Sequence, residues 1–143
     1  NVRPLEMSGA IGIEQLKKLP SFIENRRGNA KLFIKLFQND SNFMIQRELG
    51  NSSWFGFSLI IKPESNLKRK DVIKLLTEKN IECRPIVTGD FTQNEVMKYF
   101  DYEIHNDLKN AKHLHENGFF VGNQQVPIEK EINYLYKVLN SFV

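Results

Sequence analysis

The chain has 143 residues, of which 41% are hydrophobic and 26% are charged, so it is the size of one ordinary domain with enough apolar material for one core. The net charge of +3 favours an anionic ligand at most and does not require nucleic acid, and no apolar run approaches the roughly 20 residues that span a bilayer. The single cysteine, Cys83, excludes an internal disulfide and a four-thiolate metal site.

The N-terminus, Asn1-Val2-Arg3-Pro4, has neither a starting Met nor the basic-then-apolar pattern of a secretory signal. We interpret it as a cut through a longer protein. A chain without a secretory signal or disulfides suits a reducing compartment, which predicts a cytoplasmic location.

Two helices are predicted at the N-terminus, over residues 5–19 and 20–37. The first carries a loose apolar stripe and a face of small residues, Gly9, Ala10 and Gly12, which would let another backbone approach closely. Pro20 separates the two, because a proline is tolerated at the first turn of a helix, where its missing N–H costs nothing.

A strand is predicted over residues 54–61, and its mostly apolar faces indicate that it is covered at least partly on both sides. A helix over residues 68–79 should end at a left-handed Asn80. The next strand, over residues 81–87, contains Pro85, which favours an edge or a bulge. The remaining predicted elements are two short helices, a short strand and a last helix, over residues 93–100, 109–116, 119–121 and 127–142. This order predicts an α+β fold with a sheet of about three strands and helices mainly on one face.

Arg84 is the strongest candidate for a functional side chain, because it lies in the otherwise apolar segment 81–87, next to a proline and a turn. A guanidinium there needs a partner. One alternative is an internal ion pair with Glu82 or Asp90. The other is an anion clamp, since the rigid fork of arginine suits phosphate or carboxylate.

Two neighbouring features have simpler interpretations. Cys83 alternates with Arg84 along the strand and is predicted to be a buried, unreactive thiol. Trp54 lies at the mouth of its strand and is predicted to be part of the core or the wall of a pocket. The basic runs at residues 26–27 and 68–70 are interpreted as solvated helix surface.

The three histidines do not form a metal site in this interpretation. His113 and His115 are two residues apart and therefore do not face each other on a helix. His105 lies in a polar loop and is expected to be exposed.

The first 16 residues, NVRPLEMSGAIGIEQL, resemble a segment of the DegT/DnrJ/EryC1/StrS family of sugar aminotransferases and dehydratases. The shared features are an Asn-x-Arg, an acidic residue, small residues, Ile-Gly and Gln-Leu, here Asn1, Arg3, Glu6, Gly9-Ala10, Ile11-Gly12 and Gln15-Leu16. Three later blocks, SSWFGF, IECRPIV after an Asn where the family has Gly, and GFFVGN, look most like its sugar 3-dehydratase branch.

The resemblance implies the small C-terminal α/β domain of the aspartate-aminotransferase architecture, in a homodimer. Residues 1–40 would be connecting helices from a cofactor domain, and residues 41–143 the small domain. It also implies site residues: Asn1 as a donor to the cofactor phosphate of the neighbouring subunit, Arg3 as its support, and Arg84 in the substrate site, with Trp54 as a wall.

The chemistry implied by the resemblance is that of pyridoxal or pyridoxamine phosphate, whose ring acts as an electron sink. The substrate would be a nucleotide-linked 4-keto-6-deoxy sugar, dehydrated at C3 in deoxysugar and lipopolysaccharide biosynthesis. The base, a lysine in the aminotransferases and a histidine in the dehydratases, would lie upstream of Asn1. No catalytic residue is therefore expected in this chain, which alone should be inactive and bind no cofactor tightly, and transamination stays open.

Two alternatives come from other classes of protein. One is a stand-alone interaction module that docks through its first helix, and the other is a weak nucleic-acid binder, which rests only on the pI of about 9.0. The first helix also predicts self-association, because its small and apolar face would be exposed without a large domain against it.

Overall fold

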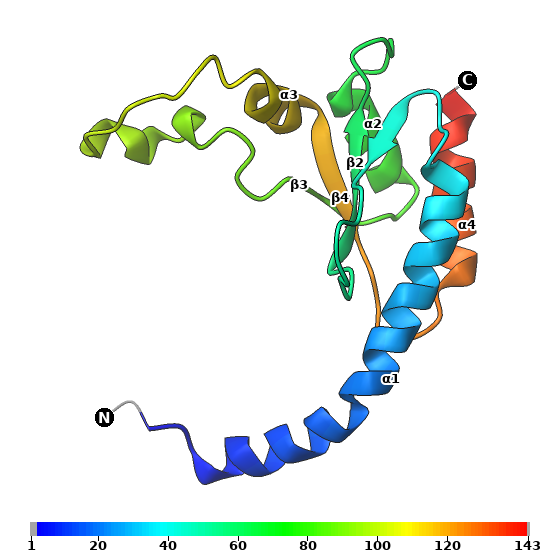
Figure 1. Cartoon of the computed structure of the whole chain (residues 1–143). Helices are drawn as coiled ribbons and strands as arrows, with labels where there is room; N and C mark the ends of the chain where they lie inside the picture. The colour runs from blue at the N-terminus through cyan, green and yellow to red at the C-terminus, as the bar shows by residue number, and fades with distance from the viewer. Residues whose placement is uncertain (1–2, 143) are drawn as a thin grey trace.

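The computed structural model describes residues 3–142, in which a four-stranded antiparallel sheet is covered by helices (Figure 1). The strands, in the spatial order β1-β2-β4-β3, are β1 (Phe43–Ile45), β2 (Gly56–Ile61), β3 (Cys83–Pro85) and β4 (Gly118–Gly122). The α-helices are α1 (Glu6–Phe37), α2 (Arg69–Glu78), α3 (Lys109–Asn117) and α4 (Glu129–Leu139). Three short 3-10 helices complete the chain: η1 (Phe91–Gln93), η2 (Glu95–Tyr99) and η3 (Asn140–Phe142).

The predicted α+β class is confirmed, but the sheet has a fourth strand. The missed strand is β1, whose three residues pair with the far end of β2, Phe43 opposite Ile61. It follows a turn in which the Asp40 carboxylate accepts the backbone N–H groups of Asn42 and Phe43 at 2.8 and 3.0 Å. So short a strand directly after a polar turn has too few residues to show an alternating pattern.

The sheet separates a core face from an open face. Along the rows of paired residues, Phe57, Val121 and Cys83 point to the face that packs against α1, α2 and α4. Because successive side chains of a strand alternate, the next row points the other way. That row consists of Ser58, Phe120 and Arg84, one from each of three adjacent strands.

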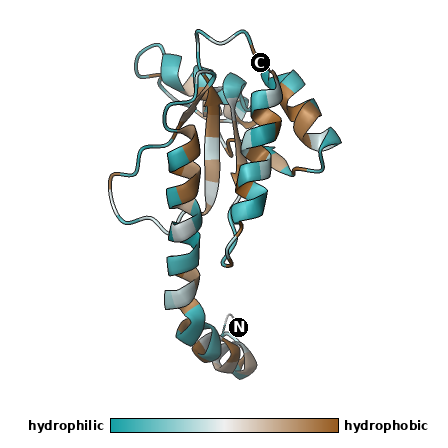
Figure 2. Cartoon of the chain, turned by 90° about the vertical axis from the view of Figure 1, so that its right-hand side faces the viewer, coloured by the Kyte–Doolittle hydropathy of each residue, from teal (hydrophilic) through white to brown (hydrophobic). Residues whose placement is uncertain are grey.

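The core is built on aromatic stacking between α1 and the sheet. Phe33 of α1 lies 4.4 Å from Phe57 of β2 and 4.8 Å from Phe37, measured between ring centroids. All three rings are fully buried. Figure 2 colours the ribbon by hydropathy and shows apolar residues, in brown, alternating with polar residues, in teal, along the helices. Among residues 3–142, none of the helices has the length and apolar composition that crossing a bilayer requires.

The prediction of two N-terminal helices was wrong, because α1 continues through Pro20 as one helix of 32 residues. Proline removes one backbone hydrogen bond from a helix interior and favours a bend. The N-terminal half of α1 lies free of the sheet and bends away from the half that packs on it (Figures 1 and 2). In this exposed stretch, water can take the place of the lost bond. Large apolar side chains here are solvent-exposed: Leu5, Met7, Ile11, Ile13, Leu16 and Leu19.

Several predicted boundaries also shift. The strand expected from residue 54 begins at Gly56, the one expected over residues 81–87 is confined to β3, and the helix over residues 93–100 is η1 and η2. Two local predictions are confirmed. Asn80 has a φ of 57°, in the left-handed region, and Pro85 lies on an edge strand.

Candidate functional site

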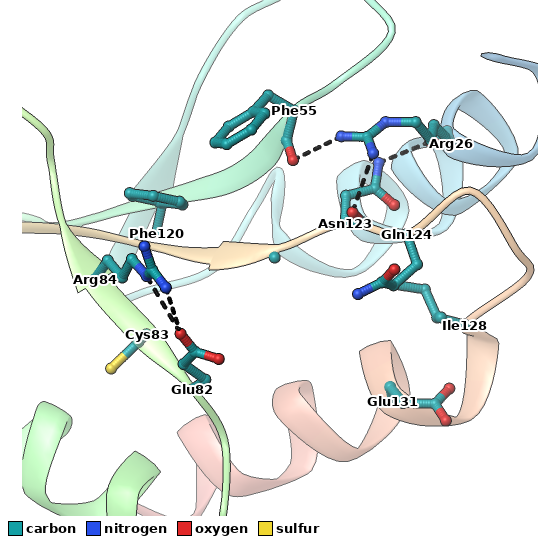
Figure 3. Close-up of a pocket in the computed structure, with 11 residues that line it drawn as sticks. Arg26, Phe55, Glu82, Cys83, Arg84, Phe120, Asn123, Gln124, Ile128 and Glu131 are labelled. Atoms are coloured by element: carbon teal, nitrogen blue, oxygen red, sulfur yellow. Dashed lines mark hydrogen bonds and ion pairs between the residues drawn. The ribbon is translucent and has the colours of Figure 1, made fainter. Parts of the chain in front are cut away.

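A pocket of about 490 Å³ lies at the end of the sheet, where β2, β3 and β4 approach the start of α4, and residues from both faces of the sheet line it (Figure 3). It brings together side chains from four separate parts of the sequence. Its lining residues are Arg26, Phe55, Glu82, Cys83, Arg84, Phe120, Gly122, Asn123, Gln124, Ile128 and Glu131.

Arg84 is one of the residues that line this pocket. Its Nη2 and Nε donate to Glu82 Oε1 at 2.9 and 3.2 Å, so the ion pair with Glu82 is also present. Both side chains are largely exposed, at 70% and 79%, and an exposed ion pair contributes little to stability. The guanidinium can therefore exchange this partner for an anionic ligand at small cost. Asp90, the other predicted partner, is instead buried beside Thr92.

Cys83 is partly buried on the core side of β3 and is also one of the residues that line the pocket. The pKa of its thiol is raised, mainly by burial. The positive charge of Arg69 partly offsets this, and the negative charge of Glu82 adds to it. A raised pKa keeps the sulfur protonated and a poor nucleophile. The raised pKa agrees with the predicted low reactivity, whereas the predicted burial is only partial.

Trp54 lies in the core, which is one of the two positions predicted for it, whereas its neighbour Phe55 is exposed. Trp54 is only 2% exposed, and its indole packs 6.2 Å from the Phe57 ring. Phe55 is 80% exposed and lies 6.1 Å from Phe120 on the open face. The cause is the backbone of Trp54, whose φ of 55° interrupts the alternation of an extended strand. Trp54 as a substrate contact stays a prediction, and the exposed aromatic at the pocket is Phe55.

Arg26 fixes this loop to α1. Its guanidinium donates to four backbone carbonyls, those of Ser53 at 3.1 Å, Trp54 at 2.8 Å, Phe55 at 2.7 Å and Asn123 at 3.2 Å. Arg27 donates to the carbonyl of residue 52 at 2.9 Å. The interpretation of residues 26–27 as a solvated basic face was therefore wrong. A basic pair in a helix shows no sequence signal for carbonyl partners some 25 residues away.

Two buried amide side chains, those of Asn29 and Asn123, also connect α1 to the sheet. Asn29 Nδ2 donates to Asn123 Oδ1 at 3.1 Å, and Asn123 Nδ2 donates to the Trp54 carbonyl at 2.9 Å. Asn29 Oδ1 also accepts from the backbone N–H of Ile128 at 3.1 Å, just before α4. Unpaired amides at these buried positions would be costly, so the network fixes how α1, β2 and the loop after β4 meet.

The segment from residue 86 to residue 108 extends from the sheet on the side opposite α1 and α4 (Figure 1). Near its start lies Gly89, whose φ of 57° suits glycine and where a Cβ would lie 2.8 Å from the Cα of His115. Asp90 then accepts from the Thr92 hydroxyl at 2.6 Å and from its backbone N–H at 3.0 Å. The hydroxyl bond is the main cause that lowers the pKa of Asp90.

The other predicted site residues lie away from the pocket or cannot be placed. Asn1 lies outside the described residues. Arg3 is exposed, just before α1, and is not among the residues that line the pocket. His113 bonds the Ile61 carbonyl through Nε2 at 3.0 Å, and His105 is exposed as expected. Over residues 3–142, His, Cys, Asp and Glu form no group of three that could hold a metal.

The pocket supplies only part of what the cofactor implied by the family resemblance needs. A pyridoxal phosphate needs a phosphate donor, a partner for its ring nitrogen and a proton carrier near its reactive carbon. The lining supplies the exposed guanidinium of Arg84 and two phenyl rings, with the carboxylates of Glu82 and Glu131 beside them, but neither a lysine nor a histidine. These groups fit an anionic, partly flat ligand, and they do not by themselves form a cofactor site.

Comparison with known proteins identifies the family of the chain. The family model of the DegT/DnrJ/EryC1/StrS aminotransferase family matches residues 1–134. The chain belongs to this family. The DegT/DnrJ/EryC1/StrS match thus spans α1, the sheet and most of α4, including every residue that lines the pocket.

Among the family's characterised members, a GDP-4-keto-6-deoxy-D-mannose 3-dehydratase of Escherichia coli O55:H7 is 57% identical over 140 residues. The match covers 97% of this chain and 36% of that protein, so the chain spans about a third of its relative's length. A solved structure of an E. coli enzyme of this name with hydrated PLP superimposes with a TM-score of 0.93, at 57% identity, over 97% of this chain and 36% of the other.

A second solved structure, a variant of GDP-4-keto-6-deoxymannose-3-dehydratase with bound GDP-perosamine, is 56% identical with a TM-score of 0.93. The match covers 97% of this chain and 36% of that structure's chain. An aminotransferase of pseudoaminic acid biosynthesis from Helicobacter pylori is only 16% identical, yet has a TM-score of 0.79 over 98% of this chain and 38% of its own. That likeness shows a shared fold and nothing more.

Proposed function

We propose that this chain is the C-terminal substrate-closing domain of a pyridoxamine- or pyridoxal-phosphate-dependent nucleotide-sugar 3-dehydratase. The substrate would be a GDP-linked 4-keto-6-deoxy sugar, and the fold would be the small domain of the aspartate-aminotransferase architecture. The observation that carries the proposal is the 57% identity to the E. coli dehydratase over 97% of the chain, with Arg84 exposed in a pocket at the end of the sheet.

In this function the cofactor supplies the electron sink for removal of the C3 hydroxyl. The residues of this chain bind and orient the substrate. Arg84 would exchange Glu82 for an anionic oxygen of the substrate, because its fork suits phosphate or carboxylate. The family relation also supports Asn1 and Arg3 as contributors to the cofactor phosphate site of a neighbouring subunit in a homodimer, and a cytoplasmic location.

Dehydration is favoured over transamination by the degree of likeness. The relatives at 57% identity are named as dehydratases, whereas the H. pylori aminotransferase is 16% identical. Membership of the family over residues 1–134 also gives no support to the readings as an interaction module or a nucleic-acid binder.

A chimera tests the proposal. The last third of the E. coli dehydratase is replaced by this chain, and consumption of GDP-4-keto-6-deoxymannose is followed together with the absorbance of the B6 cofactor. We expect cofactor binding and dehydration by the chimera, and a markedly higher KM for Arg84→Ala. The matched control is Lys74→Ala, an exposed cation on α2 that lies outside the pocket. A folded, cofactor-loaded chimera that leaves this sugar unchanged would refute the proposal.

A further inference from the structure

The exposed ring of Phe55 is held at the junction of two pockets. Phe55 and Phe120 line both the pocket that contains Arg84 and a second one of about 490 Å³ towards the segment after β3. The second is also lined by Gln46, Ser52, Gly56, Ser58, Ile86, Val87, Thr88 and Gly89. Phe55 thus stands where a ligand in either pocket would meet it.

The position of Phe55 is imposed by its neighbours. A non-glycine residue with positive φ is uncommon, and it persists only when the surrounding structure holds it. Here the buried indole of Trp54 and the bonds from Arg26 to the carbonyls of residues 53–55 fix the turn. Both contacts place the Trp54 side chain inward and the Phe55 side chain outward. The fold thereby displays a phenyl ring to water, against the hydrophobic preference of that ring.

The surroundings of the two rings define the chemistry of a ligand. Phe120 lies against Gly56, where a Cβ would come within 3.0 Å of its ring, so its place on the sheet is fixed. The Arg84 guanidinium lies beside Phe120, and Gln124 and Glu131 border the pocket on the other side (Figure 3). Flat apolar rings flanked by hydrogen-bonding groups are what a nucleobase requires, since it stacks by its face and is recognised at its edge.

We infer that Phe55 and Phe120 form an aromatic subsite that stacks on the base of the nucleotide sugar. Arg26 is the positioning residue that holds Phe55 in place. The class of ligand, a nucleotide sugar, is taken from the proposed function, and the subsite adds which part of that substrate binds here. Arg26 acts only through the loop, because its donors are already directed at four backbone carbonyls.

The test is an NMR titration of the 143-residue chain with GDP and, separately, with mannose 1-phosphate, which lacks the base. We expect GDP to shift the amide signal of Gly56, which lies against the Phe120 ring, and mannose 1-phosphate to leave this signal in place. Phe55→Ala should weaken GDP binding about tenfold, which is about 1.4 kcal/mol and within the range of one base–aromatic stack. The matched control is Phe100→Ala, an exposed phenylalanine outside both pockets, which should bind GDP normally.

A double-mutant cycle tests the role of Arg26. Arg26→Lys alone should weaken GDP binding. When Phe55 is already alanine, adding Arg26→Lys should weaken GDP binding no further, because Arg26 acts through Phe55. Full additivity would overturn the positioning role. Equal affinity of the native chain and Phe55→Ala for GDP would overturn the subsite. The chimera separates the two proposals. If the Phe55→Ala chimera dehydrates the sugar with an unchanged KM, the aromatic subsite is refuted and the proposed function stands. If the chimera is inactive while GDP binding by the chain depends on Phe55, the proposed function is refuted and the subsite stands.

Discussion

Replacing Arg26 by alanine should destabilise the whole junction between α1 and the sheet. The guanidinium donates four hydrogen bonds, and those to Trp54 and Asn123 are partly buried, at 2.8 and 3.2 Å. The carbonyls of Ser53 and Phe55 are exposed and can bond to water instead. The Trp54 carbonyl also keeps the Asn123 amide at 2.9 Å. At about 1–1.5 kcal/mol for each partly buried bond, the loss of unfolding free energy is about 2–3 kcal/mol.

Urea unfolding followed by tryptophan fluorescence measures this loss, because Trp54 is the only tryptophan and lies in the affected loop. The matched control is Arg27→Ala. Its bonds to the Ser52 carbonyl and the Asn51 side chain are exposed, so its removal should cost less than about 1 kcal/mol. If Arg26→Ala costs no more than Arg27→Ala, the reasoning that Arg26 fixes the loop fails.

Three further predictions concern packing, pH and association. Gly56→Ala should lower the free energy of unfolding by about 1–3 kcal/mol, because its Cβ would lie 2.8 Å from the Val121 carbonyl oxygen. Gly28→Ala, with no atom within 4 Å in the middle of α1, should raise it by about 0.5–1 kcal/mol, and the opposite order in urea unfolding would contradict this packing. Because the pKa of Asp90 is lowered in the fold, its carboxylate stabilises the fold at pH values above the ordinary aspartate pKa, and this contribution is lost as the pH falls through the lowered pKa. An NMR titration of the Asp90 carboxyl carbon with a midpoint at or above the ordinary aspartate pKa would contradict this. The chain should self-associate through the exposed apolar residues of α1, and Leu16→Gln should reduce the mass seen by light scattering; a monomer at every concentration would refute this.

Local patterns predicted local structure well. The spacing of apolar residues placed α2, α3 and α4 within two residues of their observed ends, apart from the 3-10 turn that closes the chain. Asn80 and Pro85 act through their own backbones, so their left-handed cap and edge position followed from residue type alone. Pro20 misled the prediction, because whether a proline ends a helix or bends it depends on the surroundings of the helix.

The candidate site was predictable only where one residue carried its own signal. Arg84 stood out as a charge inside an apolar segment, and the structure places it in the pocket with the predicted partner Glu82. Phe55 and Trp54 carried no such signal, because both are aromatic and either could have faced the core. Which of the two rings faces the core depends on Arg26 and on Asn123, which lies more than 65 residues further along the chain. Arg26 and Asn123 contact this loop only when the sheet forms.

By itself, then, the sequence determined the α+β class, the main helices, the family resemblance and the position of Arg84 as a charge inside an apolar segment, because each depends on neighbouring residues or on whole blocks of sequence. The tertiary structure decided that the sheet has four strands, that α1 is continuous, and that Phe55 rather than Trp54 borders the pocket. These features depend on hydrogen bonds and packing between segments distant in sequence, such as Arg26 with the carbonyls of residues 53–55. Such contacts leave no periodic pattern along the chain.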